Sequence, residues 1–379
     1  MHASDPACIF FRGNFMKITQ VISDTNLGGA GVLVSSVADL LKSDFDFEVI
    51  IPCGSRLKER LPSEISVKEF PMRPDRSFYP GDVSGFYKYF RKNPTDILHT
   101  HASLSSRIGG KMAGIKTCLS TRHCATGTSN DKNKAFLKSK LYNYCTDITV
   151  STADCVSREL RSEGVDPKKI VTIKNGSRCI IPIDEEQRAR EFQSLGIPSE
   201  AKIIGSCARL ERVKGQDLLL RIAPRLLSRF SDTFIMFVGD GSLLEEYRRK
   251  ASLLGIGSRI IFTGYTPSPE RYQRLFHINV NTSRGTETSC LATSECMSLG
   301  IPTVASDFGG NTEMIKNGLN GLTFKRDNEF DLERALTLLL SSKALHKRLS
   351  NGSAETYRES YSAERMADEY RKLYLSVIV

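Results

Sequence analysis

The sequence contains no tryptophan, and none of its apolar runs is long enough to cross a bilayer as a helix. Residues 1–15 lack a basic start and a long apolar core, so they make a poor signal peptide. None of the ten cysteines belongs to a CxxC pair, and no cysteine–histidine set has zinc spacing. These absences argue against membrane-spanning, disulfide-stapled and zinc-binding proteins. They favour reduced cytosolic thiols that fill a core.

The chain does have the composition of an ordinary globular protein. Its 379 residues are enough for two domains with complete cores, and it is 40% hydrophobic and 25% charged. The segment MKITQVIS, which starts at Met16, is a better beginning than the residues before it. We therefore expect residues 1–15 to be a disordered leader, either a dispensable extension or an over-long start.

The net charge of +10 is unevenly distributed along the chain. Residues 107–140 contain one acid, Asp131, and eight bases, which are Arg107, Lys111, Lys116, Arg122, Lys132, Lys134, Lys138 and Lys140. A clustered basic face favours an anionic partner: a membrane surface, a nucleic acid or a phosphorylated substrate. A solvated surface without a partner remains an equal alternative.

Short β-rich apolar runs alternate with helical patterns in both halves of the chain. The pattern predicts strands at 16–23, 47–53, 96–101, 116–123, 147–152 and 170–176, and then at 202–209, 233–241, 259–265, 277–283 and 302–307. It predicts helices at 32–43, 153–164, 217–230, 243–255 and 293–300, and almost only helix after residue 329. Strands without clean alternation, separated by helices, indicate parallel sheets covered on both faces, and hence two doubly wound domains.

The boundary between the two domains is expected near 177–200, which holds two prolines and a charge run. We predict Rossmann-like domains at 16–180 and 181–360. The last helix, within 361–379, carries an apolar stripe and is expected to dock back on the N-terminal domain. Ligands of such sheets bind beyond the carboxyl ends of the strands, so the functional motifs should lie in the loops after strands and face one cleft.

Two motifs follow strands in the expected way. Gly28 and Gly29 allow a backbone to approach a ligand before a helix begins, although the dinucleotide pattern GxGxxG is not met and a plain tight turn is an equal alternative. Arg209 and Lys214 follow another strand, where two cations can neutralise a diphosphate. The alternative for this pair is an exposed loop with ordinary charges.

The third motif holds two carboxylates eight positions apart. Glu287 follows a strand and Glu295 lies inside the next helix, and a carboxylate accepts hydrogen bonds from both hydroxyls of a vicinal diol, as in ribose or a hexose. The amides of Ser289, Cys290 and Leu291 lie between them, at a helix N-terminus that can bind phosphate or sugar oxygens. A second close-approach loop follows at 309–311.

The pattern Glu287-x7-Glu295, followed by Gly300-Ile301-Pro302 and a Gly-Gly pair at 309–310, resembles the family 4 retaining glycosyltransferases of the GT-B fold. The other motifs agree in order over residues 16–375. They are Gly28-Gly29, Ser151-Thr152-Ala153-Asp154, Asn175-Gly176, Arg209 with Lys214, Val238-Gly239-Asp240-Gly241, and Asn317-Gly318 with Gly321-Leu322. The resemblance implies an acceptor-side N-terminal domain and a donor-binding C-terminal domain.

The resemblance also implies residue roles. Arg209 and Lys214 would hold the donor diphosphate and stabilise the departing nucleoside diphosphate. Glu295 would bind the ribose, and Glu287 the transferred sugar. Further expected donor contacts are Gly28, Gly29, Gly241, Ser289, Cys290 and Leu291. His123 matches the histidine that the family places near the reacting sugar, with a core histidine as the alternative; for His99 and His101 a structural use is favoured.

The chain departs from the family at three places, one of which is Cys296, beside Glu295, where the family usually has alanine. The family often has Glu-Gly-Phe-Gly where this chain has Glu287-Thr288-Ser289-Cys290, so the amides remain but the backbone freedom of glycine does not. Ser177-Arg178 follow Asn175-Gly176 where the family often has Val-Asp, so a contact from a linker aspartate is in doubt.

The function predicted from these residues is transfer of a hexosyl unit from a nucleoside-diphosphate sugar to a hydroxyl acceptor, with retention and without a metal or cofactor. A lipid-linked or cell-surface glycan acceptor is expected, with 107–145 against an anionic membrane and the protein on the cytoplasmic side. Two alternatives stay open: a sugar-nucleotide 2-epimerase on the same fold, and a non-catalytic sugar-nucleotide binder. A nucleic-acid partner is not expected, because no module for one is present.

Overall fold

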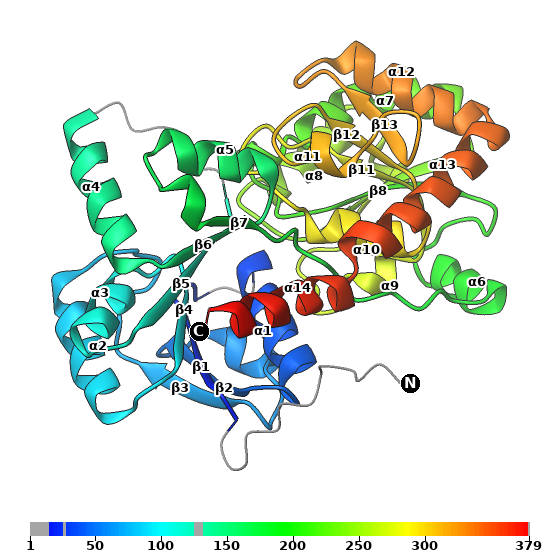
Figure 1. Ribbon diagram of the computed structural model, residues 1–379. Helices are drawn as coiled ribbons and strands as arrows, with labels where there is room; N and C mark the ends of the chain where they lie inside the picture. Colours follow the sequence, from blue (N-terminus) through cyan, green and yellow to red (C-terminus); the bar gives the residue numbers. More distant parts are fainter. Residues whose placement is uncertain (1–14, 26–27, 125–131, 378–379) are drawn as a thin grey trace, which may run out of the picture.

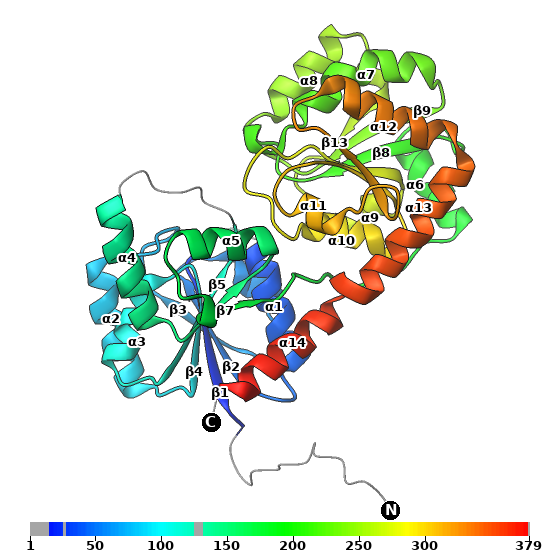
Figure 2. The same ribbon diagram turned by 45° about the horizontal axis from the view of Figure 1, so that its top comes forward.

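The computed structural model describes residues 15–25, 28–124 and 132–377. Apart from Phe15, the leader expected at 1–15 lies outside the described residues. The chain forms two α/β domains that face each other, with the C-terminal helices running along one side of both (Figures 1 and 2).

In the described part of the N-terminal domain, seven parallel strands form a sheet in the order β3-β2-β1-β4-β5-β6-β7. The strands are β1 (Lys17–Ile22), β2 (Asp46–Pro52), β3 (Ser66–Phe70), β4 (Ile97–His101), β5 (Thr117–Arg122), β6 (Ile148–Ser151) and β7 (Ile170–Thr172). The helices are α1 (Gly29–Leu41), η1 (Arg56–Arg60), α2 (Pro80–Lys92), α3 (Leu104–Met112), α4 (Lys132–Cys145), α5 (Asp154–Ser162) and η2 (Pro167–Lys169).

In the C-terminal domain, six parallel strands among the described residues form a second sheet in the order β10-β9-β8-β11-β12-β13. The strands are β8 (Lys202–Cys207), β9 (Thr233–Val238), β10 (Ile260–Phe262), β11 (Phe276–Asn281), β12 (Thr303–Ser306) and β13 (Gly321–Phe324). The helices around this sheet are α6 (Glu185–Ser194), η3 (Arg212–Lys214), α7 (Asp217–Arg229), α8 (Leu244–Leu253), η4 (Gly257–Arg259), α9 (Glu270–Gln273), α10 (Leu291–Ser298), α11 (Asn311–Met314), α12 (Glu329–Ser341) and α13 (Lys343–Thr356).

The two sheets confirm the predicted pair of doubly wound domains, and two edge strands were missed. β3 exposes most of its side chains, and β13 has only four residues, so neither carries the apolar run that marks a buried parallel strand. Both pair on one side only, at an edge of the sheet. Sequence periodicity detected the central strands and also the other two edge strands, β7 and β10, which lie within the predicted ranges 170–176 and 259–265.

Strand order reverses direction once in each sheet. The reversal lies between β1 and β4 in the N-terminal domain and between β8 and β11 in the C-terminal domain. Loops leave such neighbouring strands toward opposite faces, which opens a crevice at their carboxyl ends. In the C-terminal domain this crevice lies where β8 ends at Cys207 and β11 ends at Asn281.

The chain crosses between the domains at two places that lie side by side. Gly176 and Ser177 leave the N-terminal domain, and the chain returns through the π-helical turn η5 (Tyr357–Tyr361) into α14 (Ala363–Ser376). The Ser177 amide donates to Tyr361 O at 3.0 Å, and the Ala363 amide donates to Ser177 O at 2.9 Å. A Cβ on Gly176 would lie 2.1 Å from Ser362 O, which explains the glycine.

Helix α14 packs against α1 of the N-terminal domain (Figures 1 and 2). Its side chains Met366, Tyr370, Leu373 and Tyr374 are buried in the same apolar cluster as Ile18, on β1. Ser362 begins the helix by accepting a hydrogen bond from the Arg365 amide. The last helix of the chain thereby ties the C-terminal domain to the core of the N-terminal one.

Candidate active site

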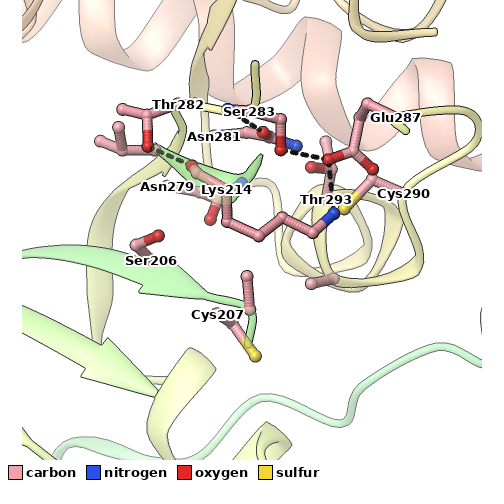
Figure 3. Close-up of a pocket in the computed structure, with 13 residues that line it drawn as sticks. Ser206, Cys207, Lys214, Asn279, Asn281, Thr282, Ser283, Glu287, Cys290 and Thr293 are labelled. Atoms are coloured by element: carbon pink, nitrogen blue, oxygen red, sulfur yellow. Dashed lines mark hydrogen bonds and ion pairs between the residues drawn. The ribbon is translucent and has the colours of Figure 1, made fainter. Parts of the chain in front are cut away.

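A small pocket lies at the strand reversal of the C-terminal domain (Figure 3). Its cavity volume is about 20 Å³, enough for a single water molecule. The lining comes from the end of β8, the end of β11 and the start of α10, and it consists of Ser206, Cys207, Ala208, Lys214, Asn279, Val280, Asn281, Thr282, Ser283, Glu287, Cys290, Ala292 and Thr293. Three of the residues predicted for donor binding, Lys214, Glu287 and Cys290, line this pocket.

Lys214 and Glu287 form an ion pair in this pocket. The distance from Lys214 Nζ to Glu287 Oε2 is 2.9 Å, and their side chains are 17% and 6% exposed. Ser283 also donates a hydrogen bond to Glu287 Oε2. Figure 3 shows the lysine side chain extended toward both. A cation and a carboxylate that predictions assigned to separate parts of a donor are thus in direct contact.

The local backbone explains why Lys214 lies here. Gly215 has a φ of 67°, and a Cβ on it would lie 2.3 Å from Thr282 O, so the turn requires glycine. Thr282 in turn donates from Oγ1 to Lys214 O at 2.8 Å. The turn after β8 is therefore fastened to the end of β11, which carries the chain toward Glu287.

The charge of Lys214 is retained despite its burial. Removal from water opposes the charged form, but Glu287 outweighs it, and the pKa of Lys214 is raised above its usual value. Arg209 is close enough to act against this increase, and its own side chain is exposed at the end of the β8 loop. Gln216 Nε2 donates a hydrogen bond to the Arg209 carbonyl at 3.0 Å and so fixes the backbone there. Two cations therefore lie near one another beyond β8.

Gly241 lies in the loop after β9, directly beside the Arg209 loop. A Cβ on Gly241 would be 2.4 Å from Leu210 O, and one on Gly239 would be 2.4 Å from Ala208 O. The Leu210 amide donates to Asp240 O at 2.8 Å. Glycine is needed because the two loops touch through their backbones, which brings Gly241 next to the cationic pair.

Glu295 lies on α10, next to a larger cavity between the domains. The cavity has a volume of about 440 Å³ and is lined by α1, by the linker at 176–181 and by Arg60, Glu270, Arg274 and Glu295. Burial raises the pKa of Glu295, while the hydrogen bond from Gln273 Nε2 at 2.9 Å opposes the increase. Burial raises the pKa of Cys207, which lines the small pocket, and the nearby Glu295 adds to the increase.

The start of α10 lies opposite the glycine loop of the N-terminal domain. A Cβ on Gly29 would be 3.8 Å from Leu291 Cδ1, and Gly28 is the residue before α1. Cys290 precedes α10 without a side-chain cap. Its amide donates to Met314 Sδ at 3.1 Å, so one of the three amides expected to face a ligand has a partner inside the domain.

His123 lies at the end of β5, in contact with another histidine. The distance between His123 Nε2 and His101 Nδ1 is 2.8 Å. Burial lowers the pKa of His123 to about 4 and that of His101 well below 6.5, so both rings are neutral near pH 7. His99 instead bonds Tyr374 of α14 at 2.8 Å, which gives it a structural use.

Sequence reasoning missed the contacts that join the two domains. Thr288 Oγ1 donates to His123 O at 3.0 Å, and Ser289 Oγ donates to Thr152 O. Glu313, on α11, accepts hydrogen bonds from the amides of Asp154 and Cys155, at 2.7 Å each. These partners are more than 130 positions apart in the chain, and no local pattern indicates them.

The basic segment at 107–140 presents less charge than the sequence predicted. Arg107 is buried, with its guanidinium 4.4 Å from the Tyr142 ring centroid. Lys111 is paired with Asp147 at 2.7 Å, and Arg122 with Glu163 at 2.5 Å. The prediction failed for Arg107 because this residue belongs to the inner face of α3. The side chains of 131–138, which carry three of the lysines, lie outside the described residues.

Within the described residues, the helices are all too short or too polar to span a membrane.

Comparison with known proteins identifies the family. Residues 27–177 match the model described as Glycosyltransferase Family 4, and residues 187–356 match the model described as Glycosyl transferases group 1. Together these regions cover most of the chain. The chain belongs to the group 1 glycosyltransferases.

Curated relatives and solved structures agree with this assignment. An uncharacterized glycosyltransferase of Methanocaldococcus jannaschii is 24% identical over 74% of this chain and 75% of the relative. A UDP-Gal:alpha-D-GlcNAc-diphosphoundecaprenol alpha-1,3-galactosyltransferase of Escherichia coli is 22% identical over 77% and 78%. HepE of Anabaena, solved with UDP, is 16% identical with a TM-score of 0.83 over 95% of this chain and 100% of that one. A glycosyltransferase of Rickettsia africae is 19% identical with a TM-score of 0.83, over 97% and 99%. The fold is GT-B.

Proposed function

We propose that this glycosyltransferase moves a hexosyl unit from a nucleoside-diphosphate sugar to a hydroxyl acceptor, with retention of the anomeric configuration. The observation that carries the proposal is the buried contact of Lys214 with Glu287 at 2.9 Å, at the strand reversal of the C-terminal domain. The solved UDP complex of HepE, which has the same fold, supports a nucleotide sugar as donor.

In the proposed complex, Arg209 and Lys214 bind the donor diphosphate. Glu295 accepts hydrogen bonds from the ribose hydroxyls, and Glu287 from hydroxyls of the transferred sugar. Gly28 and Gly29 border the diphosphate from the N-terminal domain, and Gly241 lies beside the cations. The amides of Ser289 and Leu291 face sugar or phosphate oxygens at the start of α10. His123 lies beside the reacting sugar.

The proposed reaction breaks the bond between the sugar C1 and the diphosphate oxygen. The acceptor hydroxyl attacks C1 from the face that the diphosphate leaves, and its proton passes to a leaving phosphate oxygen. Negative charge that develops on the nucleoside diphosphate is stabilised by the two cations. Lys214 and Arg209 thus supply the electrostatic stabilisation that a divalent metal gives in other transferases, and the proposal includes no metal and no cofactor.

The donor and the class of reaction can be tested together. A thermal-shift screen against UDP, GDP, ADP and their sugars identifies the base, because a ligand that binds only the folded state raises the melting temperature. If the protein is a transferase, an added acceptor should accelerate the release of nucleoside diphosphate from the sugar nucleotide that it uses. An epimerase would release or rearrange its substrate without an acceptor, and a non-catalytic binder would release nothing.

The acceptor is proposed to be a lipid-linked or cell-surface glycan intermediate at the inner face of the plasma membrane. The name of the Escherichia coli relative specifies a diphosphoundecaprenol acceptor, and residues 107–145 retain exposed bases such as Lys116. Flotation with liposomes tests this part: binding only to vesicles with anionic lipid supports it, and equal negligible binding to anionic and neutral vesicles rejects it.

A further inference from the structure

The backbone at Glu287 and Thr288 is held tightly on its C-terminal-domain side. A Cβ on Gly309 would lie 2.5 Å from Glu287 O, and one on Gly310 would lie 2.1 Å from Thr288 O. The Gly310 amide donates to Glu287 O at 3.2 Å. The glycine loop therefore supports the segment that carries Glu287 through its backbone, with no room for a side chain between them.

The other side of the same segment is held by the N-terminal domain. Thr288 Oγ1 donates to His123 O at 3.0 Å, and the Ser289 hydroxyl donates to Thr152 O. Asn175 Nδ2 donates to Ser289 O at 3.3 Å. Thr288 and Ser289 are each 6% exposed, so these hydrogen bonds are shielded from water.

Strained backbone lies in the segment that carries Glu287 and, on the other side of the contact, directly after His101, whose ring bonds His123. Thr286 has a φ of 58°, and Ala102, which follows His101, has a φ of 65°. Such left-handed conformations cost about 1–3 kcal/mol each for non-glycine residues and persist where the surroundings over-determine them. The segment that carries Glu287 and the loop after His101 are thus fixed in geometries that an isolated loop would leave.

We propose that Thr288 is a positioning residue for glycosyl transfer, which acts by holding His123 in register with Glu287 when the two domains are closed. Thr288 is covalently next to Glu287, and its hydroxyl bonds the carbonyl of His123 itself. The His123 ring is held separately, 2.8 Å from His101. The proposal rests on the proposed function, because it assigns Glu287 and His123 to the reacting sugar.

Substitution of Thr288 by valine removes the hydroxyl and keeps the branched shape, whereas serine keeps the hydroxyl. Thr95→Val is a matched control, because Thr95 Oγ1 donates to Lys17 O at 3.0 Å at the amino end of β1, away from the cleft. With the sugar nucleotide that the thermal-shift screen identifies, Thr288→Val should lower kcat about tenfold, since small misplacements of reacting groups are costly. KM for the donor should change less than twofold, and Thr288→Ser should restore kcat.

A second measurement needs no donor and separates this inference from the proposed function. Hydrogen–deuterium exchange on the nucleotide-free protein should become faster in Thr288→Val, both in peptides that contain 121–124 and in peptides that contain 287–290. Thr288→Ser and Thr95→Val should exchange like the wild type in both regions. Unchanged exchange in Thr288→Val at both regions would overturn the proposal, as would equal losses of kcat in the valine and serine variants. Failure of all tested sugars to react would instead count against the proposed function.

Discussion

At the scale of single residues, the site depends on keeping a buried lysine charged. Lys214 is largely removed from water, and Glu287 at 2.9 Å compensates by raising the pKa of the lysine. An anionic donor would bind at a site where one cation, Lys214, is already fixed in place. Arg209 adds a second cation, whose side chain can adjust to the donor because it is exposed. Because the charge of Lys214 is already in place, the site does not need to reorganise when the leaving diphosphate forms.

Removal of either cation should abolish most of the activity. Lys214→Ala and Arg209→Ala are each expected to lower kcat by about two orders of magnitude or more, because charge on the leaving nucleoside diphosphate would lose a partner. Steady-state kinetics with the active sugar nucleotide measures this. Lys202→Ala is the control, since Lys202 pairs with Asp232 at 2.9 Å outside the site. Near-normal turnover in either variant would remove the phosphate role of that residue.

Gly310 offers a test of the backbone contact under Glu287. Gly310→Ala should inactivate the enzyme, because its Cβ would meet Thr288 O at 2.1 Å and push Glu287 out of place. Gly114→Ala provides a contrast: its φ is 97°, so strain is expected, but no atom lies within 4 Å of the added Cβ. Circular dichroism and kinetics should show a folded, active Gly114→Ala protein of lower stability. An active Gly310→Ala enzyme would contradict the close packing.

The residue types in the site could be predicted from sequence, and their mutual contacts could not. Arg209, Lys214 and Glu287 follow strand ends, and Glu295 lies on α10, eight positions after Glu287. Thr288 gave no signal as a cross-cleft donor, because its partner His123 is 165 positions away. The sequence predicts a loss of backbone freedom at position 288, where the family often has glycine. In the structure, the threonine at this position supplies a hydrogen bond between the domains.

At the scale of secondary-structure elements, two helices of different domains meet end to end. Glu313, from the first turn of α11, accepts hydrogen bonds from two amides at the N-terminus of α5, at 2.7 Å each. Carboxylates are favoured at helix N-termini, where amides lack partners and the helix dipole is positive. This contact holds the domains together at a point away from the covalent linker.

Glu313→Gln should weaken domain closure while the domains stay folded. A neutral amide oxygen accepts these bonds less strongly than a carboxylate, at a cost of roughly 1–2 kcal/mol, so kcat/KM is expected to fall about tenfold. Small-angle X-ray scattering should give a larger radius of gyration than for the wild type. Glu333→Gln, on α12, weakens a partly exposed ion pair with Arg225 away from the domain contact, and should change neither. Wild-type scattering and activity in Glu313→Gln would show that this contact does not control closure.

Elements with a strong apolar period were predictable, and those shaped by tertiary contacts were not. The central strands and helices such as α7 and α8 lie within a few residues of their predicted bounds. Helix α2 was not predicted, since its three buried residues, Asp82, Phe86 and Phe90, include a charged one. It begins with Pro80 at a first-turn position and packs against α3, which no local signal specifies.

At the scale of the whole molecule, a chain of polar contacts runs from α14 through the N-terminal domain to the cleft. Tyr374 bonds His99, which bonds Thr121 at 2.7 Å, and the rings of His99 and His101 are 4.5 Å apart. The last helix of the chain therefore supports the strand end that carries the cleft histidines. This coupling joins residues 275 positions apart and is invisible in sequence.

The buried histidines predict lower stability in acid. Burial lowers the pKa of His99 to about 3 and that of His101 well below 6.5, whereas an unfolded chain protonates both near 6.5. Below pH 6.5 the unfolded state therefore binds more protons than the folded state. The histidines' contribution to the free energy of unfolding is complete above pH 6.5 and is lost progressively as the pH drops toward 3. The loss is about 1.4 kcal/mol per pH unit for each such histidine. Urea unfolding at pH 7.5, 6.5, 5.5 and 5.0 measures it, and constant or rising stability over that range would contradict the burial of neutral rings.

The central claim is that the cations beyond β8 and the two glutamates around α10 bind one nucleotide sugar. The most direct test is a crystal structure with the nucleoside diphosphate that gives the largest thermal shift. We predict diphosphate oxygens within hydrogen-bonding distance of Arg209 and Lys214, and ribose hydroxyls on Glu295. A nucleotide bound away from these side chains, with the Lys214–Glu287 pair untouched and remote from it, would contradict the account.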